Sequence, residues 1–110
     1  MGQVYDRSVM DFIGVLNKGT IEPVIVNMRD RLENVLDMAA VTNLRFDVKD
    51  SAGNAEVTNG VPSTDGMKVI CVIDTTGVGW TTDEYRLYLK FTDGSTTPEL
   101  LVGKFRVEDD

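Results

Sequence analysis

A strict alternation of apolar and polar residues marks residues 85–91. One parity carries Tyr85, Leu87, Leu89 and Phe91, and the other carries Arg86, Tyr88 and Lys90. Because successive side chains of a strand point to opposite faces, this pattern predicts a strand with one buried face. Residues 100–107 are predicted to be its hairpin partner, after a turn at residues 93–95 and a long loop through Pro98.

In the predicted partner strand, Leu101, Phe105 and Val107 share one parity with Gly103, and are expected to face the core. Residues 44–50 alternate equally well. The residues expected to be buried together between two sheets are Leu44, Phe46, Val48, Leu87, Leu89, Phe91, Phe105 and Val107.

Two apolar runs predict further strands. Residues 67–73 are rich in β-branched side chains, which predicts a strand buried on most of both faces, or buried on one face and covered by a partner on the other. Residues 23–28 predict a strand with Pro23 at its start or on a sheet edge, because proline has no N–H to donate. Residues 55–61 predict a weaker strand.

The segment from Arg29 to Val41 has two interpretations. Leu32, Val35, Leu36 and Ala39 have helical spacing, and no Gly or Pro interrupts them. The alternative is a loop that crosses between sheets with a single helical turn. Short strands with frequent turn residues predict an all-β sandwich with at most one short helix.

Residues 1–19 are more apolar than a solvated tail, and the sandwich domain is expected to span residues 20–110. The first segment is interpreted either as a strand or helix of the domain's own core, or as an arm that docks on a neighbouring subunit. If the segment is an arm, deletion of residues 1–19 should leave a folded monomer. The expected interface residues are Tyr5, Val9, Met10, Phe12, Ile13, Val15, Leu16 and Trp80.

Composition narrows the classes of partner. The 110 residues include 11 Lys and Arg against 18 Asp and Glu, which gives a net charge of −7. That balance disfavours nucleic acid, since phosphate binding depends on clustered cations. No apolar run reaches the ~18 residues of a membrane span. No secretory leader is visible either. From the charge balance and the lack of a long apolar run, neither nucleic acid nor a membrane is expected as a partner.

The chemistry-bearing residues are sparse. The chain has no histidine, so the commonest general base and a usual zinc ligand are missing. Cys71 lies in an apolar run, as is typical of a buried core residue. The best candidates for calcium ligands are Asp47, Asp50 and Asn54 around a turn, or the terminal Glu108, Asp109 and Asp110, and neither set matches the EF-hand loop. We therefore expect a protein that is not an enzyme, with no catalytic residue, metal or cofactor.

The segment Asp83-Glu84-Tyr85 and the strand after it resemble the late strand of immunoglobulin-like sandwiches, where a tyrosine follows an acidic turn. The resemblance implies that the Tyr85 hydroxyl bonds to upstream backbone. The chain has Glu84 where those domains usually carry Gly, and it lacks their paired cysteines. The expected fold is an Ig-like β-sandwich of about seven short antiparallel strands.

A wider order of segments resembles the N-terminal Ig-like domain of tailed-phage baseplate upper proteins and related small virion proteins. The segments are residues 23–30, the Leu36-Asp37-Met38 turn, residues 44–50, a strand from Gly66, the Tyr85 strand and residues 105–107. The resemblance implies a non-enzymatic structural protein that binds other proteins in the capsid decoration, neck, tail or baseplate.

The implied partners are major capsid, neck or tail subunits, or further copies of this chain, in a virion assembled in the bacterial cytoplasm. A lone reduced cysteine fits that compartment. The alternative function is a carbohydrate-binding or adhesion module with Trp80, Tyr85 and Tyr88 as sugar contacts. An exposed aromatic row on one sheet face would favour this alternative, whereas a buried tryptophan would count against it.

Overall fold

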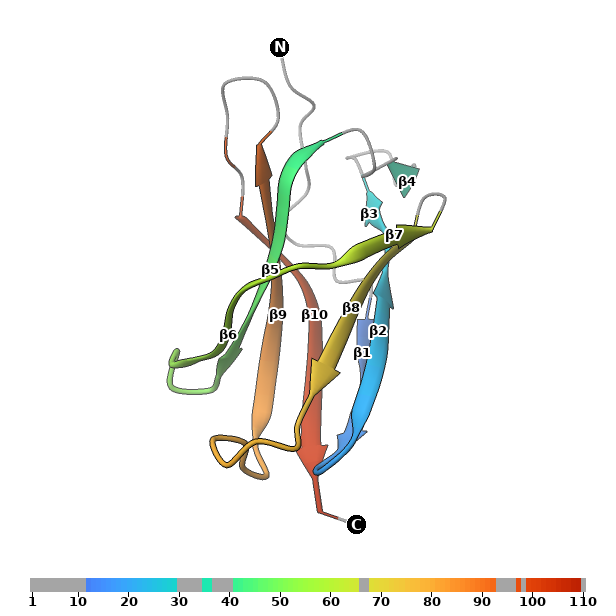
Figure 1. The fold of residues 1–110 in the computed structure, drawn as a ribbon. Coiled ribbons are helices and arrows are strands. Elements are labelled where there is room, and N and C mark those ends of the chain that lie inside the picture. The colour runs from blue at the N-terminus through green and yellow to red at the C-terminus, as the bar shows by residue number, and fades with distance from the viewer. Residues whose placement is uncertain are drawn as a thin grey trace.

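The computed structural model describes residues 12–29, 35–36, 41–65, 68–92, 97 and 99–109. These residues form two β-sheets that enclose one core, and a separate short pair of strands (Figure 1). No helix occurs among the described residues. The structure is therefore the all-β sandwich that the alternation predicts.

The larger sheet has five strands. In spatial order they are β1 (Phe12–Asn17), β10 (Glu99–Glu108), β9 (Glu84–Thr92), β5 (Thr42–Asp50) and β6 (Ala55–Gly60). β1 runs parallel to β10, and the other neighbours are antiparallel. The predicted hairpin of the Tyr85 strand with the last strand is confirmed as β9–β10, and the weak strand near residues 55–61 is confirmed as β6.

The smaller sheet has three strands, in the order β2 (Ile21–Val26), β8 (Lys68–Asp74) and β7 (Ser63–Asp65). β2 is an edge strand that begins at Ile21, so of the two positions predicted for Pro23 the sheet edge is confirmed and the strand start is wrong. The order β2-β8-β7 on one sheet and β10-β9-β5 on the other is that of immunoglobulin-like sandwiches, with β6 added at an edge as in their variable type.

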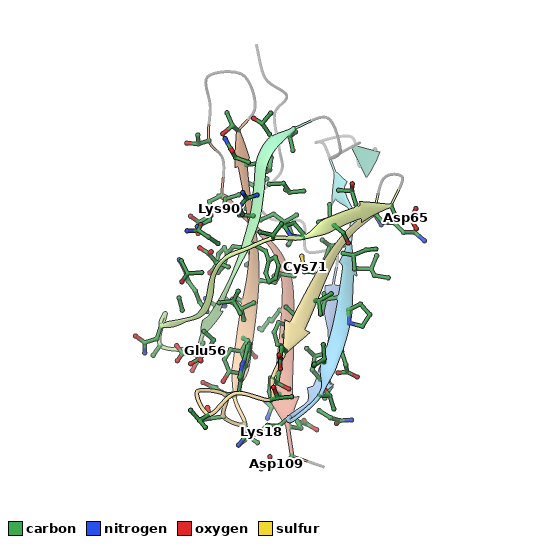
Figure 2. The ribbon with its side chains drawn as sticks, viewed as in Figure 1. Lys18, Glu56, Asp65, Cys71, Lys90 and Asp109 are labelled. Atoms are coloured by element: carbon green, nitrogen blue, oxygen red, sulfur yellow. The ribbon has the colours of Figure 1, made fainter. Side chains whose placement is uncertain are left out.

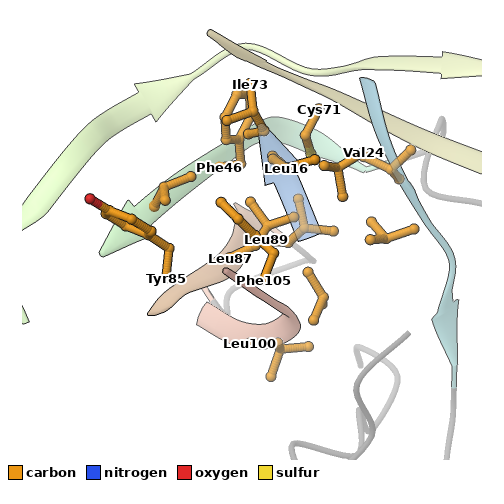
Figure 3. Close-up of a cluster of buried hydrophobic side chains, with 14 of the residues drawn as sticks. Leu16, Val24, Phe46, Cys71, Ile73, Tyr85, Leu87, Leu89, Leu100 and Phe105 are labelled. Carbon is orange, nitrogen blue, oxygen red and sulfur yellow. The ribbon is translucent and has the colours of Figure 1, made fainter. Parts of the chain in front are cut away.

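The core lies between the two inward faces (Figure 3). Its fully buried side chains include Tyr85, Phe105, Ile73, Leu87, Leu89, Leu100, Val24, Val26, Val48, Val69 and Val107. The core predicted from alternation is confirmed, except that Leu44 is only partly buried and packs against the rest. The faces of β5 and β9 are therefore those read from the sequence.

In β10 the predicted parity is wrong before residue 103. The pairing with β9 shifts between Leu101 and Gly103, so the strand carries an extra residue there. Leu100 and Val102 consequently face the core, each 2 % exposed, and Leu101 is only half-buried. Such a bulge changes which parity faces inward, and alternation alone does not reveal it.

The prediction that β8 is buried on most of both faces is also wrong. Val69, Cys71 and Ile73 are 0 % exposed, whereas Val72 is 52 % exposed. The strand is thus buried on one face within this chain. The other interpretation of the apolar run, a partner that covers the second face, stays a prediction.

The helix interpretation of residues 29–41 is wrong at the described positions. β3 (Met28–Arg29) pairs antiparallel with β4 (Val35–Leu36), so these residues are extended. Residues 30–34 and 37–40 lie outside the described residues. Helical spacing is a weak preference that tertiary pairing overrides.

The boundary expected at residue 20 does not separate an arm from the sandwich. Residues 12–17 form β1, which pairs with β10 of the same chain from Phe12 opposite Gly103 to Asn17 opposite Glu108. Leu16 is 5 % exposed and belongs to the core. This part of the segment is therefore the first strand of the domain's own fold, and residues 1–11 lie outside the described residues.

Candidate functional site

The outer face of the three-stranded sheet is apolar. Ile21, Ile25 and Val72 are 62 %, 45 % and 52 % exposed. Pro23 lies opposite Val72, and Ile25 lies opposite Ile70. We call this surface, formed by Ile21, Pro23, Ile25, Ile70 and Val72, the apolar face. Contiguous exposed apolar side chains on a folded domain mark interaction sites.

Charged residues flank the apolar face along β8. Lys68 and Asp74 are both exposed, one at each end of the strand. In the strand register, Lys68 lies opposite Asp65 of β7. Figure 2 shows Asp65 at the tip of β7. The Thr76 hydroxyl and backbone N–H donate to the Asp74 carboxylate, which lowers the pKa of Asp74. Asp74 is therefore an anion at neutral pH.

The outer face of the five-stranded sheet is charged instead. Lys49, Arg86 and Lys104 lie directly opposite one another across β5, β9 and β10. Lys49 Nζ is 3.5 Å from Glu99 Oε1, and Lys104 Nζ is 3.1 Å from Glu84 Oε1. Among the described residues, Arg86 has no acidic partner. One outer face of the sandwich is therefore apolar and the other is charged.

A hollow of about 410 Å³ lies on this charged face. Its lining residues are Asn43, Arg45, Asn59, Lys90, Phe91, Thr92, Thr97 and Glu99. Asp47 is buried beside it and accepts hydrogen bonds from Asn59 N at 2.8 Å and Lys90 Nζ at 3.0 Å. Both carboxylate oxygens of Asp47 are thus engaged in holding β5, β6 and β9 together.

The predicted interface residues separate into three groups. Leu16 and Trp80 are each 5 % exposed, so their assignment to an interface is wrong, because both fill the chain's own core. Val15 is 55 % exposed. Phe12 and Ile13 lie in β1, where their side chains are not described, and Tyr5, Val9 and Met10 lie outside the described residues.

The tyrosine corner implied by the Ig-like resemblance is confirmed. The Tyr85 hydroxyl accepts from Thr81 N at 3.0 Å and donates to Thr81 O at 3.1 Å. The Trp80 ring lies 4.9 Å from the Tyr85 ring, centroid to centroid. Both rings are buried, so neither is available to stack on a sugar. Tyr88 is half-buried on the outer face, where Lys49 Nζ lies 5.0 Å from its ring centroid.

Cys71 points from β8 into the core, as Figure 2 shows, and is 0 % exposed. Burial raises the pKa of its thiol to about 12. The thiolate that a nucleophile requires is therefore disfavoured at neutral pH. The prediction that Cys71 is a buried core residue is confirmed.

The acidic turn after β5 has a structural explanation. Asp50 Oδ1 accepts hydrogen bonds from Ala52 N at 3.0 Å and Asn54 N at 2.9 Å, and so closes the turn.

Within the described ranges, no three His, Cys, Asp or Glu side chains gather as metal ligands. The same residues include no helix long and apolar enough to span a membrane.

The apolar face was not identified from the sequence. Its signal is the outward parity of two strands, Ile21, Pro23 and Ile25 on β2 with Ile70 and Val72 on β8. Both strands appear in the sequence as nearly continuous apolar runs, which is also how strands buried on both faces appear. Only the sheet arrangement shows that the second face has no covering layer from the described residues.

No known protein family and no curated protein matches the chain. Among solved structures, the atomic-resolution structure of titin domain M7 is similar, with 11 % sequence identity and a TM-score of 0.46. The match covers 91 % of this chain and 90 % of that one. The Ig-like architecture therefore rests on this chain's own strand order and on its tyrosine corner.

Proposed function

We propose that this chain is a non-enzymatic protein-binding module that serves as a structural subunit of a tailed-phage particle. The observation that carries the proposal is the apolar face. Its side chains stand on a sheet whose other side already packs into the core. Covering this face with a neighbour would stabilise an assembly by roughly 25 cal/mol per Å² of apolar surface removed from water.

The described side chains support binding rather than catalysis. The Cys71 thiol is buried and its pKa is raised. The Asp47 carboxylate is occupied by Asn59 and Lys90. These groups hold the fold together, whereas most side chains of the apolar face are exposed.

The phage assignment is supported by the order of segments that resembles baseplate upper proteins. The segments at residues 44–50, 85–91 and 105–107 all lie in strands of the sandwich. The carbohydrate-binding alternative is less well supported, because Trp80 and Tyr85, two of its three expected contacts, are buried.

Mass spectrometry of purified phage particles from the source of the sequence tests this function. We expect the chain at a fixed ratio to the other particle proteins. In particles assembled with variants, Val72→Asp should strongly reduce incorporation, because it places a charge in the apolar face. Val78→Asp is the matched control, since Val78 is 105 % exposed in a loop outside that face. Particles that lack the chain would refute the proposal.

A further inference from the structure

We infer that the partner on the apolar face is a second copy of this chain, packed face to face about a two-fold axis. This inference rests on the proposed function, because it names the neighbour that covers the face. It is carried by the outward side chains of β8, which are in order Lys68, Ile70, Val72 and Asp74. A cation stands at one end, an anion at the other, and apolar side chains lie between them.

The charge pattern follows from the strand geometry. Val69, Cys71 and Ile73 are 0 % exposed, so the alternate residues of β8 point away from the core. At ~3.3 Å per residue, Lys68 and Asp74 are about 20 Å apart. Hydrogen bonds from Thr76 lower the pKa of Asp74, so that this end of the strand carries an anion at neutral pH.

A two-fold axis makes this surface complementary to itself. In such an interface the same patch is used on both copies. An axis in the plane of the interface, crossing β8 at Cys71, reverses the strand direction. Lys68 of each copy then meets Asp74 of the other, and Ile70 meets Val72. An axis along β8 would instead place Lys68 against Lys68 and Asp74 against Asp74, so the two charges of β8 favour the antiparallel arrangement.

The neighbouring strand β2 fits the same operation. Val24 lies opposite Cys71, so the axis passes β2 at Val24. Pro23 of one copy then faces Ile25 of the other, which extends the apolar contact across both strands. Proline at Pro23 also lacks a donor N–H, which favours packing through the sheet face over continuation of the sheet at this edge.

The net charge of −7 on each copy opposes association. On the face itself, however, the outward strand positions that carry charge are Asp65, Lys68 and Asp74, a net of one negative charge. The other outward strand positions of this sheet, Ile21, Pro23 and Ile25 on β2, Ser63 on β7 and Ile70 and Val72 on β8, carry no charge. At physiological ionic strength, charges separated by more than about 8 Å are largely screened.

Sedimentation of the purified full chain over a range of concentrations tests the inference. We expect a reversible dimer in the wild type. Val72→Asp should weaken it by at least about tenfold, as expected for a residue at the centre of an interface. Val78→Asp should leave it unchanged. A wild type that stays monomeric up to its solubility limit, or a dimer that Val72→Asp does not weaken, would overturn the inference.

A charge exchange tests the two-fold arrangement. Lys68→Glu places Glu opposite Asp74, and Asp74→Lys places Lys opposite Lys68, so each variant alone should dimerise more weakly than the wild type. An equimolar mixture should associate again, because both contacts in the mixed dimer then join opposite charges. A mixture that associates no more tightly than either variant alone would overturn this arrangement.

A further control covers the loss of the Thr76 hydrogen bonds in Asp74→Lys. If circular dichroism shows that this variant does not fold, Lys68→Glu is compared with Lys18→Glu, which makes the same charge change at an exposed turn position. Equal dimerisation of these two variants would overturn the arrangement. A monomeric chain that still enters particles overturns the dimer alone, whereas a dimer that is absent from particles overturns the phage function alone.

Discussion

Two hydrogen bonds join the Tyr85 hydroxyl to the backbone of Thr81, at a buried position next to Trp80. Tyr85→Phe keeps the ring packing but leaves these two backbone groups without that partner. We expect it to lower the free energy of unfolding by about 1–2 kcal/mol. Urea unfolding measures the change. Tyr88→Phe, on the half-buried outer face, is the control and should change the midpoint little; equal midpoints for both variants would contradict the prediction.

The Cys71 thiol makes stability depend on alkaline pH. Its pKa is about 12 in the fold against 9.0 as the ordinary value. As the pH rises, the unfolded chain therefore releases this proton before the folded chain does. The contribution of the Cys71 thiol to the free energy of unfolding is fully present below pH 9.0 and is lost as the pH rises toward 12. The slope is up to roughly 1.4 kcal/mol per pH unit.

Urea unfolding of the wild type and of Cys71→Ala across this alkaline range measures the Cys71 contribution. The test is the difference between the two proteins, because every other pH-dependent contribution is common to both. The wild type should lose more stability than the variant as pH rises. Native-state thiol labelling should be slow at neutral pH and fast in urea, and rapid native labelling would place Cys71 at the surface.

At the scale of single elements, the sequence predicted the faces of β5 and β9 because each alternates without interruption. It failed in β10, where an extra residue between Leu101 and Gly103 changes the inward parity. It also failed to identify the apolar face. That face depends on β2 and β8 lying side by side, which is a long-range pairing rather than a local pattern.

The row of Lys49, Arg86 and Lys104 predicts a stabilising substitution. Like charges directly opposite on neighbouring strands destabilise a sheet. Arg86→Glu would place an anion between two cations, and we expect it to raise the free energy of unfolding by about 0.5–1 kcal/mol at low salt. The gain in the free energy of unfolding should shrink in 1 M salt, because the Debye length falls to about 3 Å.

Urea midpoints at low and high salt check this gain. Arg86→Gln removes the repulsion without adding attraction, so its gain should be smaller than that of Arg86→Glu. A loss of stability in Arg86→Glu at low salt would show that the neighbouring ion pairs with Glu84 and Glu99 already neutralise the row.

For the whole molecule, β1 shares the sheet and the core of the other strands, because it pairs with β10 and contributes Leu16 to the core. Leu16 is buried in the shared core (Figure 3), whereas its neighbour Val15 is 55 % exposed. Leu16→Ala should therefore lower the free energy of unfolding of the isolated chain by about 2–5 kcal/mol. Val15→Ala is the control and should cost far less. An arm that docks only on a neighbour would give no loss in either variant.

The parallel pairing of β1 with β10 also has a mechanical consequence. Phe12 lies at one end of this pair and Glu108 at the other, across six paired positions from Phe12 opposite Gly103 to Asn17 opposite Glu108. Tension applied at Phe12 and Glu108 would pull the two strands in opposite directions along their shared axis. The backbone contacts between them would then share the load in shear, rather than open one after another from an end. A subunit connected to its neighbours through these two points would resist stretching along its long axis.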